Sequence, residues 1–157
     1  MNMIRSPFNG ADLIIAAVPL GIGSAVYMLF RGKGILIFKV ADAVGLGAGV
    51  EFARLVARPL NAYMHGFVLY SLPTALWAFS FLFCIVTIWR NRLKSFSAIC
   101  VVLLTIGVVL GMELAQASNF ISGRFDSADL FASVIGLGIG GTVAYAKQSI
   151  KWAKILH

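Results

Sequence analysis

The chain has 157 residues, of which 60% are hydrophobic and only 12% charged, and its mean hydropathy is +0.91. A soluble domain carries roughly 25% charged residues, so this composition excludes a water-soluble globular protein and indicates one membrane domain, residues 1–157. The formal net charge is +7, but the basic residues form short clusters between apolar runs. That pattern is typical of membrane topology signals and argues against a nucleic-acid partner.

Four apolar segments are long enough to cross a hydrocarbon core of about 30 Å. They are Leu13–Phe30, Gly66–Trp89, Ser97–Gln116 and Leu130–Ala146. Small residues in the first segment would let another helix approach closely: Gly21, Gly23 and Ser24. The predicted fold is therefore all-α, an integral membrane helical bundle with four transmembrane helices.

The segment Ile35–Leu60 has two interpretations. Its first half is apolar but contains Lys39 and Asp42, and a charge at mid-membrane costs about 3 kcal/mol or more. Its second half is amphipathic, with Glu51, Arg54 and Arg58 on one face and Phe52, Leu55 and Val56 on the other. This pattern favours a re-entrant or interfacial helix over a fifth membrane segment packed within the bundle.

The basic clusters predict the topology. The loop 90–94 and the tail 147–154 are the two densest clusters, and an even number of predicted helices separates them. They therefore share one side, which the positive-inside rule assigns to the cytoplasm, together with the C-terminus. The link 119–127 then lies on the external face, whereas the side of the N-terminus depends on the segment Ile35–Leu60.

Charged residues are concentrated around that external link. Glu113 and Gln116 are three positions apart and share one face near the end of a predicted helix. Arg124 follows in the link, and Asp126 and Asp129 stand where the last helix begins. A carboxylate at this depth should face protein or a hydrated pocket rather than lipid.

These residues have a structural and a functional interpretation. In the first, Asp126 caps the last helix, Asp129 interacts with the helix dipole, and Arg124 pairs with Glu113. In the second, three carboxylates against one arginine leave a local charge of about −2. Such a site suits an amine, a divalent cation or proton transfer, while Arg124 alone suits phosphate or carboxylate.

Two further features belong to this region. Asp129, Ser133, Gly136 and Gly140 form a stripe of small and polar residues on the last helix, and we expect it to pack against the helix that carries Glu113. His65 precedes the second predicted span on the external side, where it either reaches the carboxylates or bonds to backbone or water. Trp77 is expected to face lipid.

At these residues the chain resembles the VanZ-like family of small bacterial membrane proteins. That family has Glu-x-x-Gln near the end of one helix, then a Gly-Arg turn, an Asp, and Asp-x-x-x-Asn-x-x-Gly on the final helix. The matching residues here are Glu113, Gln116, Gly123, Arg124, Asp126, Asp129 and Gly136. Ser133 stands where the family usually has Asn, and Asn61, His65 and Tyr70 match an Asp, His and Tyr pattern loosely.

The resemblance implies four main helices, an N-terminus inside, an external segment Ile35–Leu60 and a place in the bacterial cytoplasmic membrane. The family's namesake is linked to low-level resistance to a glycopeptide antibiotic. Three functions remain open: binding of a cell-envelope precursor or lipid head group, an accessory role in a larger membrane complex, and a membrane enzyme acting on a lipid-linked substrate. Neither the spacing of Cys and His nor any known motif indicates a metal or a cofactor.

Overall fold

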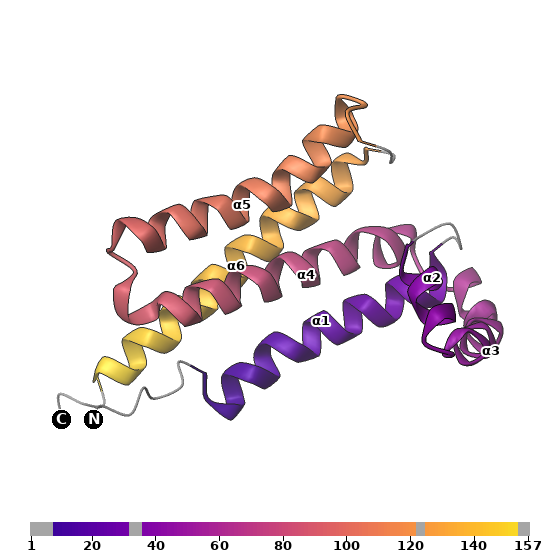
Figure 1. The fold of residues 1–157 in the computed structure, drawn as a ribbon, viewed down its shortest axis with the longest axis horizontal. Helices are drawn as coiled ribbons and strands as arrows, with labels where there is room; N and C mark the ends of the chain where they lie inside the picture. Colours follow the sequence, from indigo (N-terminus) through magenta and orange to yellow (C-terminus); the bar gives the residue numbers. More distant parts are fainter. Residues whose placement is uncertain (1–7, 32–35, 122–124, 154–157) are drawn as a thin grey trace.

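The computed structural model describes residues 8–31, 36–121 and 125–153. Every regular element in these ranges is helical (Figure 1): α1 (Gly10–Phe30), α2 (Leu36–Ala43), α3 (Gly47–Ala57), η1 (Arg58–Ala62), α4 (Gly66–Trp89), η2 (Arg90–Arg92), α5 (Phe96–Ala117) and α6 (Ser127–Ala153). Helices α1, α4, α5 and α6 are long and apolar enough to cross a membrane. The predicted all-α membrane bundle is confirmed, and the chain is a multi-pass membrane protein.

Helix α6 packs most extensively against α4, which lies in the middle of the bundle (Figure 1). Gly136 and Gly140 rest on the backbone carbonyls of Ala75 and Phe79, so closely that a Cβ at either glycine would collide with them. The expectation that these two glycines pack against α5, the helix that carries Glu113, is therefore wrong. The glycine spacing reveals which face of α6 allows a close approach, but it carries no information about which helix approaches.

Helix α1 covers another side of α4. Gly23 lies against the Pro73 carbonyl and Trp77. The Trp77 indole donates a hydrogen bond of 3.3 Å to the Ser24 hydroxyl, and its ring centre is 4.9 Å from that of Tyr27. Trp77 therefore joins two helices instead of facing lipid as expected, because an indole N–H inside the bilayer gains by finding an acceptor on a neighbouring helix.

The core lies between α1, α4 and α6. Its largest side chain, Phe83, is fully buried, and smaller residues of the three helices surround it: Ala16, Ala78, Leu82, Val86, Leu137 and Ala144. Helix α5 lies along one side of this unit (Figure 1), and only two of its residues, Ala98 and Glu113, are buried. Packing thus depends mainly on three helices, and α5 contributes a carboxylate at one end.

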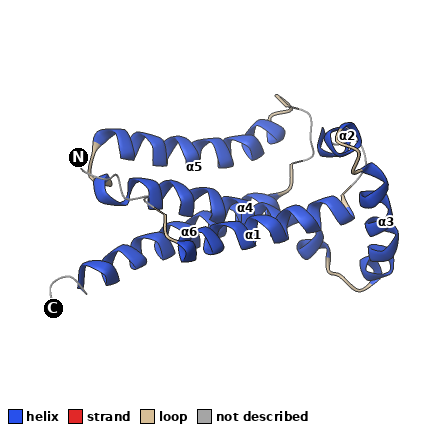
Figure 2. Ribbon diagram, turned by 60° about the horizontal axis from the view of Figure 1, so that its bottom comes forward, coloured by secondary structure: helices blue, strands red, loops and turns tan. Residues whose placement is uncertain are grey.

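The described part of segment 35–60 forms two short helices and no fifth span. Helix α2 has 8 residues and α3 has 11, which at 1.5 Å per residue is far short of a core about 30 Å thick. Figure 2 shows α3 running across the end of the bundle. Its apolar residues Phe52, Leu55 and Val56 are exposed, as an interfacial helix requires.

Four spans without a fifth bring the start of α1 and the end of α6 to the same end of the bundle (Figure 1). The loop between α4 and α5 is also at that end, with Arg90 and Arg92. We call this the basic end. The opposite end carries α2, α3, η1 and the end of α5, and we call it the acidic end because Glu113 and Asp129 lie there.

Candidate functional site

Arg31 organises the acidic end. It follows the last residue of α1, and its guanidinium lies 3.7 Å from the Asp129 carboxylate. One of its amino groups donates a hydrogen bond of 3.4 Å to the Tyr70 carbonyl. The same guanidinium lies over the rings of Tyr27 and Tyr70, at 5.3 and 5.2 Å from their centres. Arg31 is thus held by α1, α4 and α6 together.

Glu113 and Asp129 are the buried carboxylates of this end, each only 8% exposed. Asp129 uses one oxygen for Arg31, whereas its Oδ1 has no hydrogen-bond partner. The Oε2 of Glu113 is also without a partner. Glu113 lies within electrostatic reach of Asp129, Arg31 and Asp126. The structure therefore brings residues of α5 and α6 together, with Arg31 as the neighbouring cation.

Buried polar atoms without partners gather at this end. Four are found among the described residues: Arg31 Nε, Glu113 Oε2, Asp129 Oδ1 and Ser133 Oγ. Ser133 is completely buried, one turn beyond Asp129 on α6. Proteins pair most of their buried polar atoms, so each exception calls for an explanation. Three of the four atoms can accept a hydrogen bond, and such a set suits a ligand that carries N–H or O–H donors.

Two of the predicted site residues serve as helix caps. The Asp126 carboxylate accepts a hydrogen bond of 2.9 Å from the Ala128 backbone N–H at the start of α6. The His65 Nδ1 accepts one of 3.3 Å from the Phe67 N–H at the start of α4. No hydrogen bond or ion pair joins His65 to a carboxylate in the described part of the chain. These positions follow the structural interpretation of both residues.

Of the remaining predicted site residues, the structure describes Gln116 but not Arg124. Gln116 lies half-buried one turn after Glu113. Arg124 falls outside the described residues, so its predicted pairing with Glu113 is not addressed. Arg31 was not predicted as part of the site, because an arginine directly after an apolar run reads as the end of a span. No group of three or more His, Cys, Asp and Glu that could hold a metal occurs within the described ranges.

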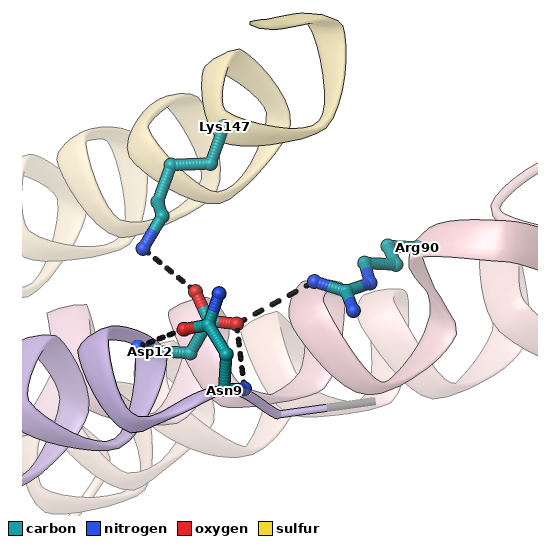
Figure 3. A network of polar contacts seen from close by, with 4 residues as sticks. All are labelled: Asn9, Asp12, Arg90 and Lys147. Atoms are coloured by element: carbon teal, nitrogen blue, oxygen red, sulfur yellow. Dashed lines mark hydrogen bonds and ion pairs between the residues drawn. The ribbon is translucent and has the colours of Figure 1, made fainter. Parts of the chain in front are cut away.

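The basic end holds a different ionic cluster, which was not predicted from the sequence either. Asp12, only 2% exposed, lies 2.7 Å from the Lys147 ammonium and 3.4 Å from the Arg90 guanidinium (Figure 3). It also accepts a hydrogen bond from the Asn9 backbone, while the Asn9 side chain caps α1. The spacing of Asn9 and Asp12 is a capping-box pattern and was the available signal. Here both carboxylate oxygens have partners, unlike those of Glu113 and Asp129.

Comparison of the chain with protein-family models, with curated proteins and with solved structures gives no match.

Proposed function

We propose that this protein binds the polar head group of an envelope lipid or lipid-linked precursor at the external face of the bacterial cytoplasmic membrane. The resemblance to the VanZ-like family, through Glu113, Gln116, Asp126 and Asp129, is part of this proposal. The observation that carries it is the set of four buried polar atoms without partners at the acidic end, which belong to Arg31, Glu113, Asp129 and Ser133. A bound head group supplies the missing hydrogen bonds.

The charge of the site selects the kind of head group. Three carboxylates, Glu113, Asp126 and Asp129, face one described cation, Arg31. Their excess negative charge favours a cationic group, and the free acceptors of Glu113, Asp129 and Ser133 favour one with N–H donors. We therefore propose a primary amine as the group that enters the site. Asp126 and His65 stay outside the contact set, since both cap helices.

Binding is tested with two lipids that differ only in these donors. Phosphatidylethanolamine carries an ammonium with three N–H donors, and phosphatidylcholine has the same charge without any. We expect the purified protein to retain the first in native mass spectrometry about tenfold better, because a charge-assisted hydrogen bond contributes about 1.5–3 kcal/mol. Glu113→Gln should abolish this preference. Equal retention of both lipids by the native protein would contradict the proposal.

Asp42→Asn is the matched control for Glu113→Gln. Asp42 is an exposed carboxylate on α2 at the same end of the molecule, so its replacement removes the same charge from outside the site. The control should retain phosphatidylethanolamine like the native protein. If both variants lose it equally, a general surface charge is responsible rather than the Glu113 site. A change in the mass of the bound lipid would show that the protein converts it, and would favour the alternative of a membrane enzyme that acts on a lipid-linked substrate.

One observation favours a second function, that of an accessory subunit. Few side chains of helix α5 are buried. The helix exposes a row of large apolar residues, Ile99, Leu103, Leu104 and Val108. Lipid covers such a face adequately, but so would a helix of a larger membrane complex. Purification of the native protein in mild detergent distinguishes the two. A stoichiometric partner protein that is lost after Leu104→Ser would favour the accessory role.

A further inference from the structure

A cavity lies beside the candidate site and shares no residue with it. It has a volume of about 320 Å³ and lies between the end of α1 and the helices α3 and η1. Its polar lining consists of Glu51, Arg54, Arg58 and Asn61. Ligand sites in proteins usually measure about 300–1,000 Å³, so the space suffices for a small anionic group. Two guanidinium groups and one carboxylate leave the lining with a net positive charge.

Arg54 is fixed in place before any ligand arrives. Its guanidinium donates hydrogen bonds to the carbonyls of Met28 and Arg31, at the end of α1. It also lies over the Phe38 ring, 4.9 Å from its centre. These contacts attach α3 to α1 and define one wall of the cavity. An immobilised wall reduces the entropy that a ligand loses on binding.

Arg58 and Asn61 supply donors that the fold itself does not use. Both are exposed, and neither side chain has a hydrogen bond or ion pair within the described part of the chain. Arg58 follows Arg54 by one helical turn and lines the same cavity. A guanidinium presents paired N–H groups whose spacing matches two oxygens of a phosphate, and an amide adds a further donor.

The remaining lining is apolar and continues to the exposed apolar residues of α3. Leu29, Phe30 and Leu55 complete the cavity wall, and Leu55 is 66% exposed beside Phe52 on α3. The cavity is at the end of a membrane-spanning helix, which is the depth of the lipid head groups. An amphiphile can therefore place an anion on Arg58 while its chains lie over Leu55 and Phe52.

We infer that the cavity between α1 and α3 binds the phosphate group of a membrane phospholipid. Arg58 forms the paired contact, Asn61 adds a donor, and the Arg54 wall contributes positive charge. This assignment is independent of the proposed function, because the candidate site takes an amine through Glu113, Asp129 and Ser133. It also gives the exposed apolar face of α3 a partner, the acyl chains of the same lipid.

The inference is tested by native mass spectrometry of the full chain, delipidated in mild detergent. The two probes are phosphatidylglycerol and diglucosyl-diacylglycerol with the same acyl chains but no phosphate. We expect one equivalent of phosphatidylglycerol to bind at least about tenfold more tightly than the glycolipid. Arg58→Gln should remove this difference, and Arg58→Lys should restore part of it, since an ammonium keeps the charge but not the paired donors.

Arg92→Gln is the matched control, because Arg92 is an exposed arginine at the basic end. It should leave phosphatidylglycerol binding unchanged, as should Glu113→Gln, which tests the other site. Displacement of the lipid by millimolar inorganic phosphate would show that the anion alone is sufficient for binding. No displacement would show that the lipid chains are also needed. Both results are compatible with a phosphate site. Equal binding of the two lipids, or unchanged binding by Arg58→Gln, would overturn it.

Discussion

Asp12 and Asp129 show how differently two buried aspartates are used. Both lie in the first turn of a membrane helix, where the helix dipole favours negative charge. Asp12 has partners for both oxygens, from Arg90, Lys147 and the Asn9 backbone (Figure 3). Asp129 has Arg31 for one oxygen and nothing for the other. The first arrangement stabilises the bundle, whereas the second leaves one oxygen of Asp129 able to accept a hydrogen bond from a ligand.

The residue-scale prediction concerns Asp12. Replacing it by Asn removes the charge that Arg90 and Lys147 share while keeping the size of the side chain. Breaking a buried ion pair costs about 3–5 kcal/mol, and the partly exposed Lys147 lowers this to about 2 kcal/mol. We expect a clearly lower Tm for Asp12→Asn in detergent, measured by circular dichroism. The exposed Asp42→Asn should melt like the native protein, and equal Tm values for all three would contradict a stabilising role.

At the scale of elements, the contact between α4 and α6 decides the fold. Gly136 and Gly140 let the two backbones approach, while Gly138, between them in sequence, has no atom within 4 Å of the position of a Cβ. The three glycines thus share one helix but only two face a neighbour. In a membrane, where lipid is as apolar as the side chains, such close contact is a main source of helix association.

This difference gives a prediction with an internal control. Gly140→Ala places a methyl group against the Phe79 carbonyl, and overpacking of this kind costs about 1–3 kcal/mol. Gly138→Ala adds the same methyl group on an open face, where alanine favours the helix by about 0.5–1 kcal/mol. We expect the first variant to melt below the native protein and the second at or above it. The same Tm change in both would mean that helix propensity, not packing, is measured.

Sequence patterns predicted the helices well and their neighbours poorly. The segment Gly66–Trp89 was predicted with the bounds of α4, since hydrophobic length alone defines a span. The position of Arg31 beside Asp129 was not predictable, because it depends on how α1 and α6, which are far apart in the sequence, both pack against α4. The same limitation explains the wrong partner for the glycine stripe. Hydrophobic periodicity describes one helix at a time, whereas residues from three helices form the site.

The whole molecule has two unlike ends. At the basic end the described acid, Asp12, is satisfied by cations, and Arg92 and Lys94 remain exposed. At the acidic end, one carboxylate oxygen of Glu113 and one of Asp129 lack a hydrogen-bond partner, and the cavity between α1 and α3 lies nearby. Short dense clusters of Lys and Arg next to the spans mark the cytoplasmic side of a membrane protein, and the two densest clusters, 90–94 and 147–154, follow the spans at the basic end. We therefore expect both candidate sites to face outward.

Cysteine labelling tests this orientation. In a background with Cys84→Ala and Cys100→Ala, a single cysteine is placed at Ser118 on the acidic end or at Asn91 on the basic end, both exposed. We expect a membrane-impermeant maleimide to label Ser118→Cys in intact spheroplasts and Asn91→Cys only after lysis. The expected orientation follows from the positive-inside rule, which acts through basic residues near the ends of the spans. Labelling of Asn91→Cys in intact spheroplasts, and of Ser118→Cys only after lysis, would instead place the candidate sites on the cytoplasmic side. An external envelope ligand would then have no access to the Glu113 site, and the proposed function would fail. The inference of a phosphate site would still stand, because its lipid occurs in both leaflets.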